Sequence, residues 1–141
     1  MSFDITSTNS RVVLTCDLFT AQLQQFSADT SYEGEEDTVA ETRMSIDGKM
    51  VAGQTPSVKP VTIHLEASSP SLQYMYLLKQ SMEKNHKPYP CQLVISQPSV
   101  GRRTIYSNGC LVSAKDLADG KKLLDPTTWK FNFESKSVET L

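Results

Sequence analysis

Residues 61–71, VTIHLEASSPS, decide the fold, because they join a strand to the start of a helix. In residues 61–66 apolar side chains alternate with polar ones, which is the pattern of a strand with one buried face. Pro60 is placed at the entrance of this strand, since proline cannot donate a hydrogen bond to a β-ladder. Ser69 is expected to be the N-cap of the following helix and Pro70 its first residue, where a missing N–H costs nothing.

The helix is predicted over residues 70–85. Its apolar side chains recur at helical spacing and form one broad stripe, whereas lysine, glutamine and glutamate occupy the other side. Pro88 and Pro90 prevent the helix from continuing. We therefore expect one amphipathic helix that packs on a sheet.

Upstream of this unit, alternation predicts a strand over residues 11–18 and a second, less regular strand over residues 19–26. Residues 42–52 form two further strand-like runs, separated by Asp47-Gly48. Asp-Gly at this spacing is a strong hairpin signal, because both central residues of a type I′ turn need φ > 0. The sequence therefore predicts a β-hairpin with Asp47 and Gly48 in its turn.

Downstream of the helix, the segments that read as strands are residues 91–97, 103–107, 110–115 and 129–135. Asn108-Gly109 is expected to form a turn between the second and the third. In the last segment aromatic side chains alternate with polar ones, so we expect these aromatic residues to anchor the core. The predicted core comprises Val12, Leu14, Val61, Ile63, Leu65, Met75, Leu78, Leu93, Ile95, Trp129, Phe131 and Phe133.

The length of 141 residues predicts a single domain, residues 1–141. With 38% hydrophobic and 21% charged residues the chain is too apolar to be disordered. Its apolar runs are far shorter than the roughly 18 residues of a membrane-spanning helix. The N-terminus lacks the basic and apolar segments of a secretory signal, so we expect synthesis in the cytosol.

The net charge of −2 hides an uneven distribution of charge. Up to Asp47 there are nine acidic and two basic residues, whereas the rest of the chain has twelve basic and seven acidic residues. The crowded acidic stretch is either a solvated loop or a surface that meets basic side chains on another copy of the chain. The candidate acidic residues are Glu33, Glu35, Glu36, Asp37 and Glu41, and the candidate basic partners are Arg102, Arg103, Lys121 and Lys122. The overall acidity argues against gripping nucleic acid, which requires clustered basic residues.

No enzyme motif and no metal-ligand spacing occurs in the sequence. His64 and His86 have no cysteine or carboxylate at ligand spacing, so no catalytic residue, cofactor or metal is expected. Cys16, Cys91 and Cys110 are expected to be reduced and mostly buried thiols. The alternatives are a disulfide, or a nucleophilic Cys16 or Cys110 that acts with His64 and has a lowered thiol pKa.

The order of these elements resembles that of bacteriophage tail tube proteins, in particular the short tube proteins of contractile-tailed phages. The resemblance rests on SIDGK at residues 45–49, VTIHLEASSPS at residues 61–71 and WKFNFE at residues 129–134, and it spans residues 11–136. It implies a mainly β fold of two packed antiparallel sheets, sandwich or barrel-like, with one flanking α-helix. It also implies a long hairpin arm, residues 27–60. Type VI secretion and pyocin tubes share that plan.

By the same resemblance, the chain would assemble with itself into hexameric rings that stack into the hollow inner tube of a phage tail. Genome DNA would pass through the lumen without specific binding. The other expected partners are tail sheath, tape measure, baseplate or initiator, and tail terminator proteins. The protein would be part of the virion after synthesis in the host bacterial cytoplasm.

The arm is expected to contact an adjacent subunit or ring. Its acidic residues at an interface would make assembly sensitive to salt, whereas acidic residues that line the lumen would repel DNA phosphates and leave assembly largely insensitive. Two other interpretations stay open. One is another phage structural protein, such as a tail terminator. The other is a monomeric β-rich binding or adaptor module, which self-association would distinguish from a tube protein.

Overall fold

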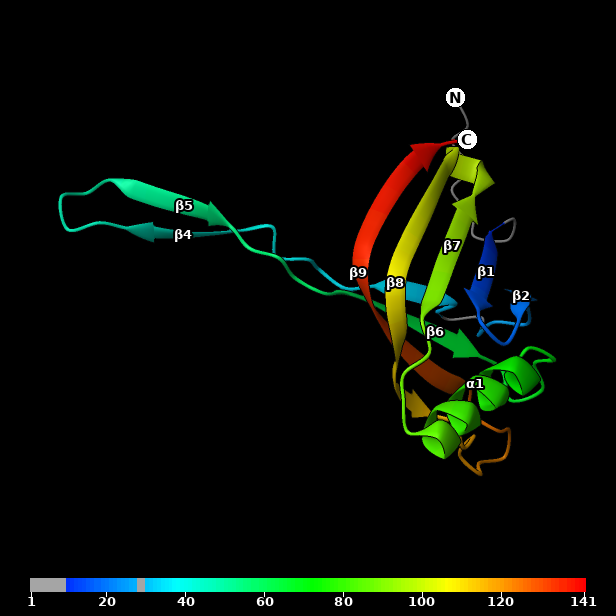
Figure 1. Ribbon diagram of the computed structural model, residues 1–141. Helices are drawn as coiled ribbons and strands as arrows, with labels where there is room; N and C mark the ends of the chain where they lie inside the picture. The colour runs from blue at the N-terminus through cyan, green and yellow to red at the C-terminus, as the bar shows by residue number, and fades with distance from the viewer. Residues whose placement is uncertain (1–9, 28–29) are drawn as a thin grey trace.

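The computed structural model describes residues 10–27 and 30–141, which consist mainly of β-strands (Figure 1). The strands are β1 (Arg11–Cys16), β2 (Thr20–Leu23), β3 (Tyr32–Gly34), β4 (Ala40–Met44), β5 (Met50–Gln54), β6 (Lys59–Leu65), β7 (Cys91–Gln97), β8 (Arg102–Lys115) and β9 (Thr127–Thr140). The helical elements are α1 (Leu72–Asn85) and the short 3₁₀ helix η1 (Pro98–Val100).

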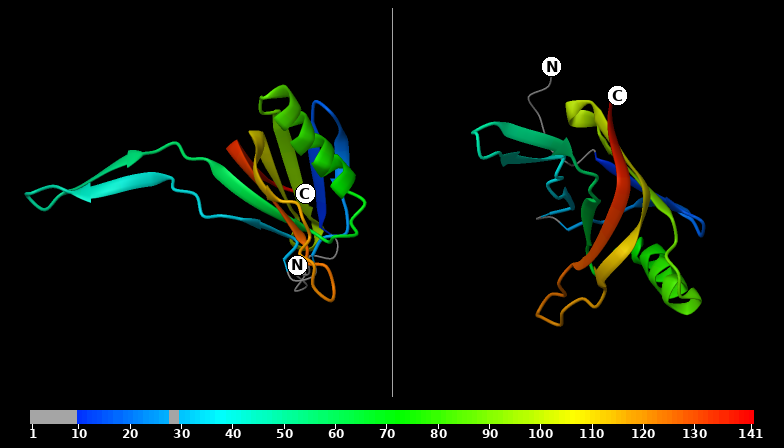
Figure 2. Two further views of the ribbon diagram at one scale, coloured as in Figure 1. Left: turned by 90° about the horizontal axis from the view of Figure 1, so that it is seen from below. Right: turned by 60° about the vertical axis from the view of Figure 1, so that its left-hand side comes forward.

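Seven strands form one antiparallel sheet in the order β2-β1-β7-β8-β9-β6-β3, and this sheet is strongly curved (Figures 1 and 2). Its two ends approach each other through the residues that follow β2. Phe26 forms an antiparallel bridge with Leu65 of β6, and the Ser27 N–H donates to the His64 carbonyl at 3.0 Å. The sheet therefore curls into a nearly closed, barrel-like form around one core.

The core is filled by apolar side chains from the curled sheet and from α1. All of the positions predicted as core from the sequence are buried. Trp129, Phe131 and Phe133 of β9 are among the largest fully buried side chains. Tyr76 of α1 packs edge-on against Trp129, with ring centroids 5.7 Å apart. The helix therefore packs on the sheet through the stripe that its sequence indicated.

Helix α1 begins later than predicted. Ser71 rather than Ser69 occupies the N-cap position, so the assignment of Ser69 as the cap and Pro70 as the first helical residue is wrong. Ser69 Oγ accepts from the Ser71 N–H at 3.3 Å, and both serines bind Gln24, the residue after β2: Ser69 Oγ donates to the Gln24 carbonyl at 2.5 Å, and Ser71 Oγ accepts from the Gln24 N–H at 2.8 Å. These bonds satisfy backbone groups next to β2, and they hold the start of α1 against the sheet.

The hairpin predicted at Asp47-Gly48 is present, but its turn is not of type I′. The Ser45 N–H donates to the Lys49 carbonyl at 2.8 Å, and the Gly48 N–H donates to the Ser45 carbonyl at 3.0 Å. Gly48 has a φ of 84°, whereas Asp47 does not adopt a positive φ. The loop therefore has three residues, a β-turn followed by a left-handed glycine, which is the next most common connection for a hairpin.

Asn108-Gly109 does not form the predicted turn, because β8 continues through it as one strand of 14 residues. The extra residue is absorbed in a β-bulge opposite β7, between the pairs Cys91–Gly109 and Leu93–Tyr106. Asn108 has a φ of 56° at this bulge. Since β8 pairs with β7 on one side and with β9 along its length, the two ladders override the local turn preference.

A long arm projects from the curled sheet (Figures 1 and 2). At its foot β3 pairs with β6, and the Glu35 N–H donates to the Pro60 carbonyl at 3.2 Å. The two ends of the expected arm, residues 27–60, are thus bound into the main sheet. We define the arm as residues 36–58.

The expected fold class, mainly β with antiparallel sheets and one helix, is confirmed. The strands are divided unevenly between two sheets: β4 and β5 form the second sheet alone, in the arm. The two sheets do not pack on each other as the resemblance implied, because every residue of β4 and β5 is exposed and the core lies between the curled seven-stranded sheet and α1.

Candidate assembly interface

The ribbon formed by β4 and β5 has one uncharged face. Directly opposed residues of an antiparallel pair share a face, and successive residues alternate between the two faces. One face carries the pairs Ala40–Gln54, Thr42–Ala52 and Met44–Met50, and the other carries Glu41, Gly53, Arg43 and Val51. We call the first of these the neutral face.

None of the described residues outside the ribbon covers either of its faces. Every residue of β4 and β5 is exposed, and the side chains of Met44 and Met50 are 67% and 65% exposed. Ile46, at the tip, is fully exposed. Isolated two-stranded hairpins are marginally stable in water, and grouped apolar side chains on a surface mark interaction sites. The ribbon thus has the character of a surface that another molecule covers.

The candidate acidic residues fall into two groups. Glu33 and Glu35 are paired inside the chain, where Glu33 Oε1 lies 3.0 Å from His64 Nε2 and Glu35 Oε1 lies 3.2 Å from Lys130 Nζ. The candidates that form no ion pair with any described residue are Glu36, Asp37 and Glu41. All three of these lie in the arm.

The candidate basic residues do not meet the acidic ones within one chain. Arg103 Nη2 lies 2.6 Å from Glu139 Oε2, and Lys121 Nζ lies 2.9 Å from Asp125 Oδ2. The hydrogen bond to Asp125 raises the pKa of Lys121. Arg102 and Lys122 are exposed and form no ion pair with described residues. Contacts between these groups on different copies stay a prediction.

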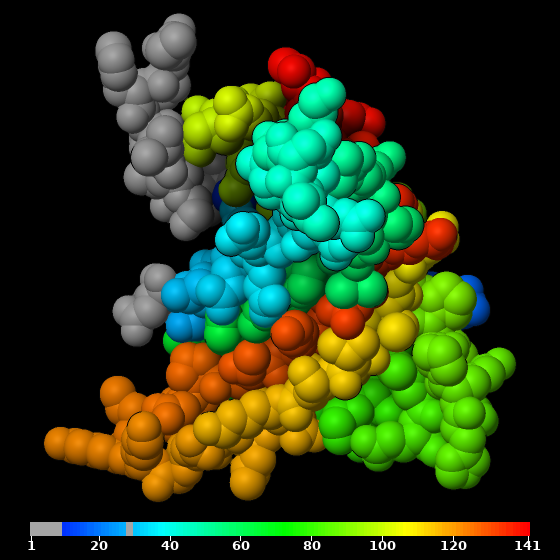
Figure 3. All heavy atoms as spheres, turned by 90° about the vertical axis from the view of Figure 1, so that its left-hand side faces the viewer, coloured from blue at the N-terminus to red at the C-terminus, as the bar shows by residue number. Residues whose placement is uncertain are grey.

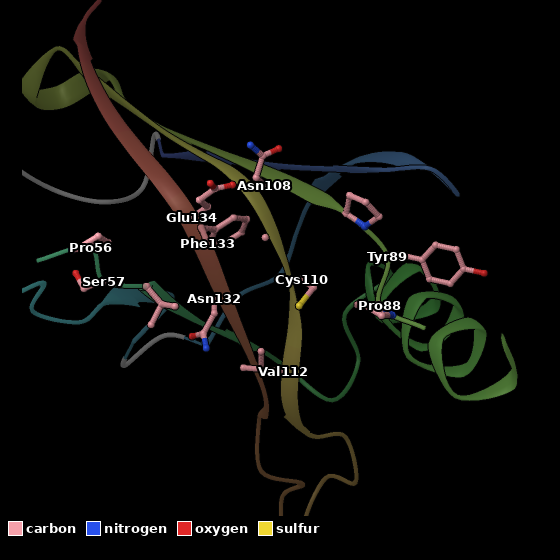
Figure 4. A pocket seen from close by; sticks show the side chains of 13 residues that line it. Pro56, Ser57, Pro88, Tyr89, Asn108, Cys110, Val112, Asn132, Phe133 and Glu134 are labelled. Carbon is pink, nitrogen blue, oxygen red and sulfur yellow. The ribbon is translucent and has the colours of Figure 1, made fainter. Parts of the chain in front are cut away.

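An apolar groove of about 750 Å³ lies at the foot of the arm (Figure 4). Its lining includes Pro56 and Val58 from the arm, Pro88 and Pro90 from the connector between α1 and β7, and Cys110, Val112 and Phe133 from β8 and β9. Figure 3 views the molecule along the arm, with β9 and β8 crossing beneath the arm and α1 to one side. Val58 and Val112 are 56% and 47% exposed, so the groove is open to solvent.

The groove has no signal in the sequence, because its two walls come from residues 56–58 and 88–90, which only the fold brings together. The neutral face of the ribbon did have a signal in the sequence. In residues 40–44, before Asp47-Gly48, the charged Glu41 and Arg43 alternate with uncharged residues, and this alternation assigns the charges to one face.

The three cysteines are free thiols, as predicted, but only Cys91 is buried, whereas Cys16 and Cys110 are half-buried. Desolvation raises the pKa of the Cys91 thiol to about 12. His64 is held between Glu33 and Thr128, whose Oγ1 lies 3.2 Å from Nδ1. Among the described residues, no three histidine, cysteine or acidic side chains are grouped to hold a metal ion. Within the same part of the chain, no helix is long and apolar enough to cross a membrane.

Several solved structures share this fold at low sequence identity. The cap of the anti-feeding prophage, described as its tube terminating cap, matches with a TM-score of 0.64 and 13% identity, over 100% of this chain and 94% of that chain. A chain in the sheath/tube terminator of the PVC extracellular contractile injection system matches with a TM-score of 0.62 and 8% identity, over 99% of both chains. A chain in the sheath-tube complex of the PVC system also matches with a TM-score of 0.62, at 9% identity, over 99% of this chain and 93% of that chain.

These matches agree with the resemblance to phage tail tube proteins at the level of the fold. A search of curated proteins gives no match. A model of the family described as "Tail fiber protein gp32" matches residues 3–137, which is nearly the whole chain. The chain therefore belongs to the tail fiber protein gp32 family.

Proposed function

We propose that this chain is a self-assembling structural component of a tail, and that its copies form hexameric rings that stack into a hollow tube. Membership of a family of tail proteins supports a structural role in a tail. The fold supports the finer assignment, since chains with this fold occur in structures of tubes and tube terminators of contractile systems. The observation that carries the proposal is the arm, whose ribbon is exposed on both faces.

An arm that projects from one side of a subunit favours assembly with rotational or helical symmetry. If the arm of one copy binds a different surface of the next copy, the contact is heterologous, and such contacts close into rings or continue as filaments. The edges of the curled sheet, β2 and β3, give further surfaces that a neighbouring copy would cover.

On this proposal DNA passes through the lumen without being bound. The chain has a net charge of −2 and lacks the clustered lysine and arginine residues that neutralise phosphates in DNA-binding proteins. A tail sheath, a tape measure, baseplate or initiator proteins and a terminator are the further partners that a tube requires, and the assembled protein would be located in the virion.

A second candidate function is that of a tail terminator. It is favoured by the reported solved structures of a tube terminating cap and of a sheath/tube terminator. A terminator ends a tube with a ring of fixed size, whereas a tube protein repeats the same ring along the axis.

Negative-stain electron microscopy of the purified chain, over a range of concentration and salt, tests these functions. Hollow tubes of variable length would support the tube protein. Single rings of uniform mass at every concentration would favour the terminator. A strict monomer at every concentration and salt would contradict self-assembly and favour the binding or adaptor module.

A further inference from the structure

Two surfaces are left uncovered by the described residues, the neutral face of the ribbon and the apolar groove at the foot of the arm. The ribbon of a given copy does not reach the groove of that copy, because Pro56 and Val58 at the foot of its arm form one wall. The arm extends away from this wall (Figure 1). From Val58 back to Met50 the extended chain spans roughly 25 Å at about 3.3 Å per residue.

We propose that the groove receives the neutral face of the ribbon from a second copy of this chain. The proposal rests on the self-assembly described above and names the surface that accepts the arm. Each copy would then be donor at its ribbon and acceptor at its groove.

The chemistry of the two surfaces matches. The neutral face has no charged side chain, and its two methionines, Met44 and Met50, are flexible enough to fill an irregular apolar surface. The groove is apolar on both walls, and its volume of about 750 Å³ accommodates several such side chains. The amide side chains of Asn108 and Asn132 in its lining can bind the polar edge of the ribbon.

The charges around the two surfaces are complementary. The connector that forms one wall of the groove is preceded by Lys84 and Lys87, which form no ion pair with described residues, and Lys87 Nζ lies 5.3 Å from the centroid of the Tyr89 ring in the lining. The arm carries Glu36, Asp37 and Glu41, which are likewise unpaired among the described residues. Opposite fields of this kind set the orientation of a docked partner.

The lining contains one acidic residue, Glu134, which would repel an acidic arm. Glu134 is exposed, so its carboxylate stays in contact with water at the rim of the groove. A ribbon bound by its neutral face turns Glu41 and Arg43 away from the lining.

The foot of the arm, Pro56 and Val58, connects the groove of a copy to the ribbon of the same copy. Because Pro56 and Val58 belong to the arm and also line the groove, a ribbon that docks in the groove lies beside the arm of the copy that receives it. Docking at one copy would therefore fix the direction of the arm that reaches the next copy. This relation favours a closed ring or a regular stack over random aggregation.

Cys110 lies in the groove and makes the proposal testable by cross-linking. In the full chain, Met44→Cys places a thiol on the neutral face, and Arg43→Cys places one on the charged face of the same strand. After copper-phenanthroline oxidation of concentrated protein, we expect at least tenfold more intermolecular disulfide to Cys110 for Met44→Cys than for Arg43→Cys. Cys110→Ser should remove this product, and peptide mapping should exclude Cys16 as the linked residue.

Equal cross-linking of the two variants, no cross-linking to Cys110, or a link that maps to Cys16 would each overturn the proposal. If rings or tubes still form in any of these cases, the proposed function stands and only the groove is excluded as the receiver of the arm. If the protein stays monomeric and does not cross-link, both the proposed self-assembly and the groove as the receiver of the arm are excluded.

A second comparison does not depend on introduced thiols. Val112→Glu places a charge on the floor of the groove, whereas Leu117→Glu places one at a residue that is 77% exposed and outside the lining. We expect Val112→Glu to raise the concentration needed for assembly at least tenfold and Leu117→Glu to leave it unchanged, with both variants folded by circular dichroism. Assembly of Val112→Glu at the wild-type concentration would overturn the proposal.

Discussion

The ring of Phe133 occupies the space that a side chain on Gly109 would need. A Cβ at Gly109 would lie 2.3 Å from Phe133 Cδ1 and 2.3 Å from the Asn132 carbonyl oxygen. Phe133 in turn packs on Phe131 and Tyr106, with ring centroids 6.0 and 5.3 Å away. Glycine at this position allows β8 to close over the aromatic cluster directly beneath the groove.

Gly109→Ala should therefore destabilise the fold. The added methyl group forces a shift of Phe133 or of the β9 backbone, and overpacking of this kind costs about 1–3 kcal/mol. The free energy of unfolding in urea measures the effect. Gly53→Ala is the matched control, since a Cβ at Gly53 meets nothing within 4 Å. Equal unfolding midpoints for the two variants would contradict the packing described here.

The start of α1 depends on Ser71. Its Oγ accepts the Gln24 N–H at 2.8 Å, and the Ser71 side chain is buried. Ser71→Ala leaves this N–H without its acceptor, so we expect a loss of about 1–3 kcal/mol in the free energy of unfolding. Ser81→Ala, later in α1, should change it by less than about 0.5 kcal/mol. The free energies of unfolding in urea of the two variants are compared, and a larger loss for Ser81→Ala than for Ser71→Ala would contradict this role of Ser71.

The buried thiol of Cys91 should make stability depend on pH in the alkaline range. Folding raises its pKa from 9.0 to about 12, mainly through desolvation. The unfolded chain therefore loses this proton first as the pH rises, and the contribution of the neutral buried thiol is complete below pH 9 and lost as the pH approaches 12.

The measurement is the urea midpoint between pH 8 and pH 10. Wild-type protein should lose stability more steeply over this interval than Cys91→Ala, whatever the difference between them at pH 8. Parallel pH dependences of the two proteins would show that Cys91 does not titrate in this way.

Assembly should weaken at high salt if the acidic residues of the arm meet basic residues of another copy. Raising the salt from about 0.05 M to about 0.5 M shortens the Debye length from roughly 14 Å to roughly 4 Å. The double variant Glu36→Gln, Asp37→Asn should assemble with a smaller salt dependence than wild type, as followed by light scattering. Asp125→Asn, whose carboxylate pairs with Lys121 inside the chain, is the control. An unchanged salt dependence in the double variant would place these acids in the lumen instead.

The sequence correctly predicted the elements in which the local residue pattern agrees with the packing in the folded chain. Trp129, Phe131 and Phe133 alternate with polar residues and are buried, as expected of a strand that faces the core. Asn108-Gly109 failed as a predictor because turn preference is local, whereas β8 is held by ladders on both sides. The helix begins later than the predicted cap at Ser69, although the Ser69 hydroxyl accepts the Ser71 N–H at 3.3 Å and also donates to the Gln24 carbonyl.

The candidate interface was predictable only in part. The acidic composition of the arm and the hairpin at Asp47-Gly48 were visible in the sequence, and so was the alternation that gives the ribbon a neutral face. The groove was not, because Pro56 and Pro88 lie far apart in the chain and line the same groove only in the folded protein. Intramolecular pairs such as Glu35 with Lys130 also required the register of the folded sheet.

Replacement of the arm tests whether the arm drives assembly. In the variant, residues 38–55 are replaced by a short Gly-Ser linker, which leaves β3, β6 and the curled sheet in place. Light-scattering mass should rise with concentration to at least six times the 15.7 kDa chain for wild type, and stay at one chain for the variant. Equal masses for the two proteins at every concentration would contradict the claim that the arm drives assembly.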